Sequence, residues 1–334
     1  MKKFPMLTIK TMLVCAAVGL LGSGFATNSQ AADKITLKLG HIQTENDFWH
    51  LGSLKFKEEL EKRSNGAIVL NIYANSTLGG DRDLVEGMQI GTVDFGLVAG
   101  VLSNFEGTIG LLELPYLFDN QDEFNKIIHG PIGEEISGNV LKKTSVRILN
   151  WWDRGPRQIT SNKPINKLAD LKGLKIRMPQ IPAMVASFKA MGANPTPMAW
   201  SEVYTGLEQN VIEAQENPIP FIYGGRIQEV QKYIALTDHK YEYVTIAMSD
   251  KRWQSLNEEQ RKIITEAADV ATAYENKLVI DKTNELLEEM KKGGLQVTTP
   301  DKKELAVAAR TAHEDYAKTV DLDLYKRIVK ELGR

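Results

Sequence analysis

Residues 35–98 read ITLKLGHIQTENDFWHLGSLKFKEELEKRSNGAIVLNIYANSTLGGDRDLVEGMQIGTVDFGLV and alternate between strand and helix patterns. Apolar side chains at every second position predict strands at 35–42 and 67–73, and a short apolar run predicts a third strand at 94–98. Polar and glycine-containing segments separate these strands and mark the ends of the elements between them.

Two helix patterns lie between these strands. Asn46 or Asp47 can cap the first helix, which we expect to continue to about residue 63, and the second stops near Gly91. Strand, helix, strand, helix, strand is typical of a parallel sheet with right-handed crossovers, and such sheets bind ligands beyond the carboxyl ends of their strands. We expect these ends near His41, Ala74 and Ala99.

The rest of the chain continues in the same style and adds one long helix. Strand patterns occur at 146–151, 174–178 and 241–248, and residues 158–160 are expected to be a separate short extended piece. Residues 257–291 contain no proline or glycine, and their apolar residues recur at helical spacing, which predicts a helix on the order of 50 Å long. The alternative is two helices with a kink near Asp281.

The organisation of the chain favours two lobes. Its 334 residues correspond to about two domains at roughly 150 residues each. Because the sequence contains no internal repeat and no low-complexity linker, we expect strands that cross between the lobes rather than a flexible tether. A helix as long as the predicted one would run along both lobes.

The composition is that of a globular protein, and its charge balance does not support nucleic-acid binding. Hydrophobic residues make up 43 % of the chain and charged residues 25 %, which allows a full core and argues against a multi-span membrane protein. The 41 basic residues against 43 acidic ones give a net charge of −2, without the basic excess that phosphate binding requires.

The first 31 residues are predicted to be a secretory signal peptide. Lys2 and Lys3 precede an apolar run at 12–21, which is shorter than the roughly 20 residues that span a bilayer. Ser29 and Ala31 are the small residues expected before a cleavage site, which we place after Ala31. The protein is therefore expected in the periplasm.

A lipid anchor on Cys15 is the alternative to cleavage. It is disfavoured because Val14 is bulky where lipoprotein signals carry a small residue. Cleavage would remove three lysines and no acidic residue, leaving 38 basic and 43 acidic residues and a net charge of −5. It would also remove the single cysteine, so the mature chain would contain neither a disulfide nor a thiol.

Motifs for catalysis and metal binding are missing from the sequence. The five histidines show no HExxH spacing, and the mature chain has no GxSxG, Walker or EF-hand pattern. We therefore expect no catalytic residue, no bound metal and no cofactor.

Arginines next to carboxyl or amide side chains stand out instead. They occur in three segments: NWWDRGPRQ at 150–158, GLKIRMP at 173–179 and EAQENP at 213–218. Arg177 lies on a predicted short strand, with Ile176 and Met178 on the opposite face. An arginine held at a strand end can grip a carboxylate through two parallel hydrogen bonds, a geometry that lysine cannot copy. The alternative is that these arginines are ordinary surface or ion-paired residues.

Six motifs in a fixed order resemble the substrate-binding proteins of tripartite ATP-independent periplasmic (TRAP) transporters. They are LGGDR at 78–82, QIGTVD at 89–94, LPYLF at 114–118, DLKGLKIR at 170–177, GANPTPM at 192–198 and QENP at 215–218. The resemblance covers essentially the whole mature chain. It implies a two-lobed α/β periplasmic-binding-protein fold, with a cleft between the lobes and a long helix spanning both.

Domain boundaries and partners can be assigned on this basis. We expect lobe I at 32–154 plus about 243–282, and lobe II at 155–242 plus about 283–334. The resemblance implies a small-molecule carboxylate as ligand and TRAP membrane subunits as partners, driven by an ion gradient rather than by ATP.

The matching motifs also imply ligand contacts at four positions. Arg177, in the KIR segment, would form the bidentate bridge to the ligand carboxylate. Arg157 corresponds to the arginine of the preceding G-x-R segment and Asn217 to the asparagine of the QENP motif. The aromatic residue Trp200 would pack on the ligand.

Ligand identity is expected to depend on positions outside these motifs. The candidates are His41, Gln43, Asp81, Trp152, Asp153, Glu216, His239 and Tyr241. Ala99 and Gly100 stand where sialic-acid-binding members carry an acidic residue, so sialate is not expected. Polar groups beside flat aromatic side chains suit a polyhydroxylated ligand, because each buried hydroxyl needs a partner.

We therefore expect a sugar acid such as a hexuronate or an aldonate. A C4-dicarboxylate or 2-oxo acid is the alternative ligand, because two arginines could hold two carboxylates. Two alternatives concern the kind of protein: a sensory subunit that presents its closed form to a receptor, and an exported lyase or hydrolase acting on sugar acids.

Overall fold

The computed structural model describes residues 34–334, so the expected signal peptide at 1–31 and the alternative anchor at Cys15 lie outside the described residues. The strands are β1 (Ile35–Gly40), β2 (Ile68–Tyr73), β3 (Phe95–Val98), β4 (Val146–Ser161), β5 (Lys175–Met178), β6 (Asn194–Pro197), β7 (Ala214–Pro218), β8 (Tyr233–Ala235), β9 (Tyr241–Ser249) and β10 (Gln296–Thr298). The helices are α1 (Phe48–Arg63), α2 (Asp81–Ile90), α3 (Gln121–Ile128), α4 (Pro131–Thr144), α5 (Pro182–Ala190), α6 (Val203–Glu208), α7 (Ile219–Gly224), α8 (Asp250–Gln254), α9 (Glu258–Lys292), α10 (Lys302–Arg310), α11 (His313–Val320) and α12 (Leu322–Glu331).

The N-terminal strands form the parallel sheet that the sequence predicted. β1 lies between β2 and β3 and is parallel to both, and α1 and α2 provide the crossovers between them. Asp47 caps α1 by accepting a hydrogen bond from the backbone N–H of Trp49 at 2.9 Å. β9 then joins β3 in the antiparallel direction and extends this half of the sheet.

A second group of strands forms the other half of the sheet. β5 is parallel to both β6 and β7, and β7 pairs with β4 in the antiparallel direction. β8 pairs with β4 and β10 beside this group. The full order along the sheet is β2-β1-β3-β9-β4-β7-β5-β6.

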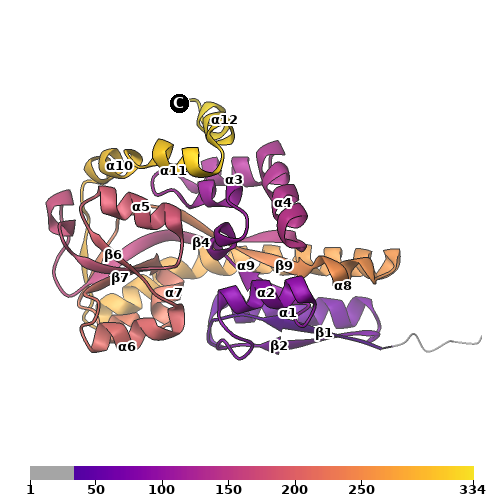
Figure 1. Cartoon of the computed structure of the whole chain (residues 1–334). Helices are drawn as coiled ribbons and strands as arrows, with labels where there is room; N and C mark the ends of the chain where they lie inside the picture. The colour runs from indigo at the N-terminus through magenta and orange to yellow at the C-terminus, as the bar shows by residue number, and fades with distance from the viewer. Residues whose placement is uncertain (1–33) are drawn as a thin grey trace, which may run out of the picture. The chain divides into compact units, whose positions relative to one another are not determined.

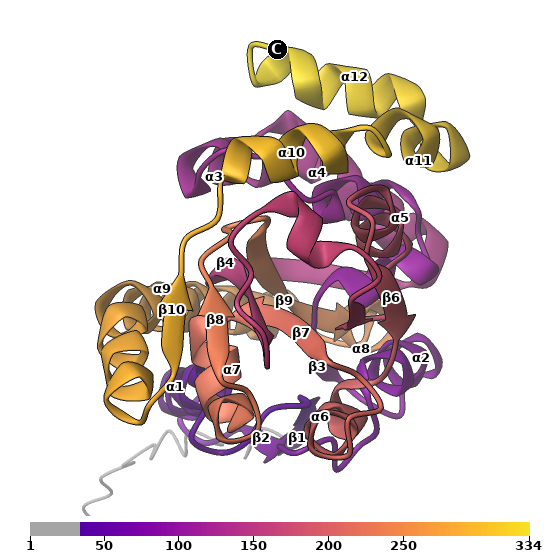
Figure 2. The same cartoon turned by 90° about the vertical axis from the view of Figure 1, so that its left-hand side faces the viewer.

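β4 connects the two halves and differs from the prediction. The sequence pattern divided this segment into a strand at 146–151 and a separate short extended piece, whereas β4 is one strand of 16 residues. Its first part pairs with β9 and its last residues pair with β7, as Figure 2 shows. The register shifts between Asp153 and Gly155, where the positive φ of 74° suits glycine. This bulge lets the strand continue through a segment that sequence periodicity divides.

α9 is a single helix of 35 residues, so the predicted long helix is confirmed and the kinked alternative is not found. Asn257 caps it through a capping box with Gln260. Ile264 and Ala267 pack in the core cluster that contains β1 and β3, whereas Met290 packs with α6 and α7. The helix therefore runs along both lobes of the fold (Figure 1). The exact lobe boundaries stay a prediction.

Candidate ligand-binding site

A pocket of about 400 Å³ lies where the carboxyl ends of parallel strands meet. Ile42 follows β1, Ala99 follows β3 and Pro179 follows β5, which is the edge at which α/β sheets bind ligands. The lining residues are Ile42, Trp49, Asp81, Ala99, Gly100, Val101, Arg154, Arg157, Arg177, Pro179, Ile181, Trp200, Asn217, Phe221 and Glu242.

β5 carries Arg177 into the pocket wall. The strand alternates, so Ile176 and Met178 are fully buried in the core while Arg177 faces the pocket with 4 % of its surface exposed. Burial lowers the pKa of Arg177 to about 10, which still leaves the guanidinium charged at neutral pH. Among the ion pairs of residues 34–334, no carboxylate is paired with Arg177.

The guanidinium of Arg177 is held along one edge only. Its Nε and Nη2 donate to the backbone carbonyl of Met198 at 3.0 and 2.8 Å. Nη1 and the second hydrogen of Nη2 remain as a fork that matches the two oxygens of a carboxylate. The ring of Trp200 lies beside this group, 5.8 Å from the guanidinium carbon, and provides an apolar wall.

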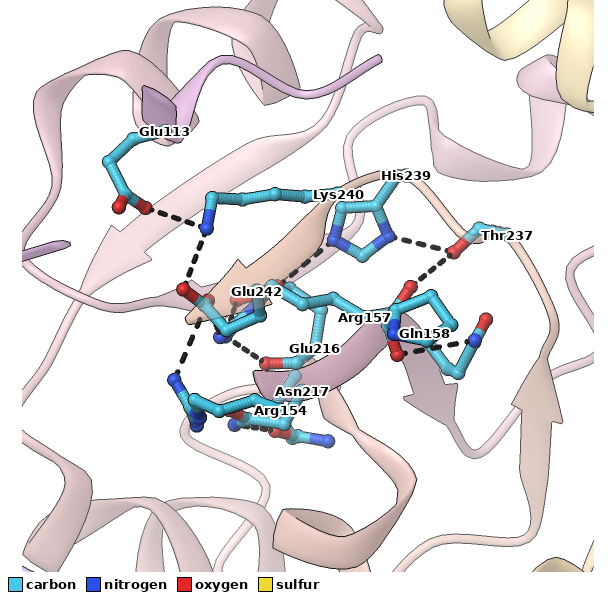
Figure 3. A network of polar contacts seen from close by, with 12 residues as sticks. Glu113, Arg154, Arg157, Gln158, Glu216, Asn217, Thr237, His239, Lys240 and Glu242 are labelled. Carbon is cyan, nitrogen blue, oxygen red and sulfur yellow. Dashed lines mark hydrogen bonds and ion pairs between the residues drawn. The ribbon is translucent and has the colours of Figure 1, made fainter. Parts of the chain in front are cut away.

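Arg157 is bound much more completely. Its Nη2 donates to the backbone carbonyl and to Oε1 of Glu216, both at 2.8 Å, its Nε donates to Oε2 of Glu216, and its Nη1 donates to Glu242 (Figure 3). Burial opposes the charge of Arg157, but the attraction of Glu216 and Glu242 outweighs it and raises the pKa. One hydrogen on Nη1 is therefore all that this guanidinium has left to offer a ligand.

Further charged and polar groups lie behind Arg157. Lys240 places Nζ 2.7 Å from Oε1 of Glu242 and 3.0 Å from Glu113, and His239 places Nε2 3.0 Å from Glu216. Although burial disfavours the ionised form of Glu242, Lys240 and Arg157 hold its pKa well below the usual range. The network in Figure 3 therefore fixes Arg157 and Glu242 in place.

Arg154 lines the same pocket with few partners. Its guanidinium carbon lies 4.3 Å from the ring of Phe221 and 4.8 Å from that of Trp49, so the group is held between two aromatic side chains. Its Nη1 is 3.5 Å from Oε2 of Glu242, which is an ion pair rather than a hydrogen bond. Its Nε is buried and has no hydrogen-bond partner among the described residues.

Asp81 and Asn217 add acceptors and donors. Asp81 begins α2, and burial raises the pKa of its carboxyl to about 6, against the opposing charges of Arg154 and Arg177. Asn217 lies at the end of β7 and donates from Nδ2 to the side chain of Gln215 at 2.7 Å. The pocket thus presents carboxyl and amide groups together with aromatic faces.

Of the twelve predicted site residues, five line this pocket: Arg177, Arg157, Asn217, Trp200 and Asp81. Glu216 contacts Arg157 from behind instead, and His239 contacts Glu216 in turn. Trp152 is fully buried, and its Nε1 donates to Thr272 on α9.

The remaining four predicted residues belong to other surroundings. His41 is 3.1 Å from His50, and Gln43 donates to Asp47 at 3.0 Å, so both are buried beside the start of α1. Asp153 and Tyr241 line a separate groove with residues of α9 and α10. Asp153 and Tyr241 lie off the pocket lining because neighbouring residues on β4 and β9 face opposite sides of the sheet.

Sequence reasoning missed Arg154, Glu242, Trp49 and Phe221 in the pocket wall. Arg154 and Arg157 are three residues apart, and in a regular strand they would face opposite sides. The bulge at Gly155 adds a residue to β4, so both arginines reach Glu242. The Gly-Pro pair at 155–156 is the signal that could have indicated this irregularity.

Two general features of the described residues are relevant to the site. Within residues 34–334, no cluster of three or more His, Cys, Asp or Glu side chains is arranged to hold a metal ion. No helix in that range combines the length and the apolar character needed to cross a membrane.

Known proteins share both the sequence and the fold. Residues 39–321 match the family described as bacterial extracellular solute-binding protein, family 7. The solute-binding protein RD1_1052 of Roseobacter denitrificans is 38 % identical over 259 residues, covering 78 % of this chain and 80 % of that protein. The 2,3-diketo-L-gulonate-binding periplasmic protein of Escherichia coli is 34 % identical over 281 residues, covering 83 % and 84 %.

Solved structures agree with these relatives. The R. denitrificans TRAP periplasmic solute-binding protein, crystallised with L-galactonate, superposes with a TM-score of 0.84 at 34 % identity over 90 % of this chain and 99 % of that one. A Haemophilus influenzae TRAP solute-binding protein with bound L-gulonate gives 0.84 at 32 % identity over 89 % and 100 %. The resemblance predicted from the motifs is confirmed: the chain belongs to family 7 of the bacterial extracellular solute-binding proteins, the solute-binding proteins of TRAP transporters.

Proposed function

We propose that this protein captures a sugar acid with a single carboxylate, such as an aldonate or hexuronate, in the periplasm and delivers it to the membrane subunits of a TRAP transporter. The observation that carries the proposal is the state of Arg177. It is a buried arginine of the pocket wall whose ion pairs, within residues 34–334, include no protein carboxylate. Its free edge has the geometry for one ligand carboxylate.

The rest of the pocket wall favours a polyhydroxylated ligand. The carboxyl groups of Asp81 and Glu242 line the pocket and can accept hydrogen bonds from ligand hydroxyls. A second ligand carboxylate beside them would meet like charge instead. Trp49, Trp200 and Phe221 offer faces for the carbon chain of a sugar acid. The relatives that bind galactonate, gulonate and diketogulonate support the same class.

A C4-dicarboxylate or 2-oxo acid is the second candidate ligand. A dicarboxylate would need another arginine with a free edge, and the sequence suggested Arg157 for this role. Because Glu216 and Glu242 occupy nearly all donors of Arg157, this side chain could grip a second carboxylate only by losing buried ion pairs. Arg154 keeps free donors in the same pocket, but Asp81 and Glu242 line the wall as well and would repel a second carboxylate. The pocket therefore favours the sugar acid.

The protein would act by binding rather than by turnover. A ligand that contacts both lobes shifts the equilibrium between open and closed forms by its difference in affinity for them. The closed form would dock on the transporter's membrane subunits. An enzyme of the same fold would have to convert its ligand, and a sensory subunit would present its closed form to a receptor.

Mass spectrometry of the small molecules that co-purify with the protein tests the proposal. We expect a sugar acid to be released on denaturation and to be recovered unchanged after prolonged incubation with fresh protein. A thermal-shift panel of uronates, aldonates and dicarboxylates should show the largest rise in melting temperature with a sugar acid, because binding stabilises the folded state by mass action. Release of a dicarboxylate, or conversion of the ligand, would reject the proposal.

A further inference from the structure

Arg154 combines burial with unused hydrogen-bonding capacity. Its side chain is 6 % exposed, yet it makes no hydrogen bond within residues 34–334 and its Nε is left without a partner. Leaving a buried donor of a guanidinium without a hydrogen bond is costly, because that donor gives up water on burial. Such a group in the wall of a ligand pocket points to a ligand atom as the missing acceptor.

The surroundings of Arg154 hold it in place without using its donors. The rings of Trp49 and Phe221 contact it at 4.8 and 4.3 Å, and they meet each other edge to face with 5.5 Å between their centroids. Glu242 attracts its charge across 3.5 Å. Stacking and charge attraction therefore orient the guanidinium while its donors stay available for acceptors in the pocket.

Arg157 shows the opposite arrangement. Glu216 and Glu242 take its donors, and Glu242 is shared with Arg154. Arg157 thereby holds the carboxylate that attracts Arg154. One Nη1 hydrogen remains for the ligand contact that the family motif implies for Arg157.

We infer that Arg154 is a further arginine that touches the ligand, and that it donates to a hydroxyl oxygen of the sugar acid whose carboxylate Arg177 holds. The inference rests on the proposed function. Arg154 then selects for the hydroxylated part of the ligand, and Arg177 for its acidic end. The two arginines would divide recognition between them.

Calorimetric titration of L-galactonate and its monodeoxy analogues tests this division of roles. Arg154→Met keeps the aliphatic contacts between the two aromatic rings and removes the donors. We expect it to weaken L-galactonate binding roughly 10- to 100-fold, the range for a lost hydrogen bond from a charged group. The wild type should bind one monodeoxy analogue more weakly than L-galactonate by a similar factor. Arg154→Met should bind that analogue and L-galactonate almost equally, because removing the hydroxyl and removing the arginine abolish the same hydrogen bond.

Arg147→Met is the matched control. Arg147 lies on the same strand, stacks on Trp253 at 5.2 Å and pairs with Asp250 at 2.6 Å, but it is not part of the pocket. The Arg147→Met variant should bind L-galactonate with the same affinity as the wild type. If Arg154→Met does not fold, the same titrations are carried out on Arg154→Lys, which keeps the charge. In this variant, removal of the same ligand hydroxyl should reduce the affinity less than it does in the wild type.

The outcomes separate this inference from the proposed function. If the variant at Arg154 binds L-galactonate as tightly as the wild type, or if all monodeoxy analogues are penalised equally in both proteins, Arg154 is structural and the inference is wrong while the proposed function stands. If the wild type binds no sugar acid at all, the proposed function fails and the inference fails with it.

Discussion

Arg177 shows how one residue combines local geometry and chemistry. The alternation of β5 buries its neighbours and turns its side chain to the pocket, and the Met198 carbonyl fixes one edge of the guanidinium. Because the Met198 carbonyl already orients the guanidinium, Arg177 loses less conformational entropy when its other edge binds a carboxylate. The position of Arg177 in the pocket wall could be predicted from the sequence because strand alternation is a local property.

Replacing Arg177 with lysine should therefore impair binding although the charge is kept. Lysine carries a point charge and cannot bond both carboxylate oxygens while it holds the Met198 carbonyl. We expect Arg177→Lys to lose about 2 kcal/mol of binding free energy, or roughly 30-fold in affinity, by calorimetry with L-gulonate. Arg147→Lys, outside the pocket, is the control, and equal affinities of Arg177→Lys and the wild type would remove Arg177 from its proposed role.

Asp81 should discriminate between ligand classes. Its carboxyl lies in the pocket wall, where it can accept from a hydroxyl but repels a second carboxylate. We expect Asp81→Asn to reduce the affinity for L-gulonate roughly tenfold, in line with the loss of one hydrogen bond to a charged group. The affinity for succinate should stay unchanged or increase. Titrations of both ligands against both proteins measure this difference, and a parallel loss for the two ligands would contradict it.

At the same scale, Arg154 and Arg157 show what local sequence patterns do not determine. Both arginines are visible in the segment at 150–158, but the ion pairs that occupy Arg157 come from β7 and β9, about 59 and 85 residues away. Which arginine keeps free donors depends on these distant partners and on the bulge at Gly155. Neither can be read from local periodicity.

Among the elements, α9 and β4 illustrate the same contrast. α9 was predictable because an uninterrupted helical pattern with a capping residue determines its own boundaries. β4 was predicted only in pieces, since the pairing of its two parts with β9 and β7 is non-local. The N-terminal strands were predicted correctly because each alternates clearly and is followed by a well-marked helix.

α9 also contains a buried acid that sequence patterns did not indicate. Glu275 is fully buried, and neither carboxyl oxygen has a partner among the described residues. Gly52 allows Trp152 and Glu275 to pack closely against α1, because a Cβ atom at position 52 would lie 2.7 Å from the ring of Trp152 and 3.0 Å from the side chain of Glu275. Burial, reinforced by Asp153 and Asp47, raises the pKa of Glu275 well above its ordinary value of 4.5.

This raised pKa makes folding stability depend on pH. The folded chain keeps the proton of Glu275 while the unfolded chain releases it above pH 4.5, so the contribution is largest at low pH and is lost as pH rises. Glu275→Gln should be more stable than the wild type at pH 7 to 8, with a difference that grows by at most about 1.4 kcal/mol per pH unit and vanishes near pH 4.

Denaturant unfolding at several pH values measures the effect. Glu285→Gln is the control on the exposed face of the same helix and should not reproduce this pH dependence. A stability difference for Glu275→Gln that stays constant from pH 4 to pH 8 would show that Glu275 is ionised in the folded protein.

For the whole molecule, the position of the pocket links binding to the arrangement of the lobes. Its wall takes Ile42 and Ala99 from the half of the sheet around β1, and Arg177 and Asn217 from the half around β5. A ligand in this pocket contacts both halves, which β4, β9 and α9 connect. The net charge of −5 expected for the mature chain repels anions at long range, so the local arginines must supply the attraction.

Calorimetric titration of the purified mature protein with L-galactonate, L-gulonate and D-galacturonate, in parallel with succinate, tests the central claim most directly. Protein that has been unfolded, dialysed and refolded excludes any ligand carried through purification. The claim that Arg177 holds one carboxylate while the pocket wall holds hydroxyls predicts that at least one sugar acid binds at least about tenfold more tightly than succinate, a difference of roughly 1.4 kcal/mol. Tighter binding of succinate than of every sugar acid would contradict it.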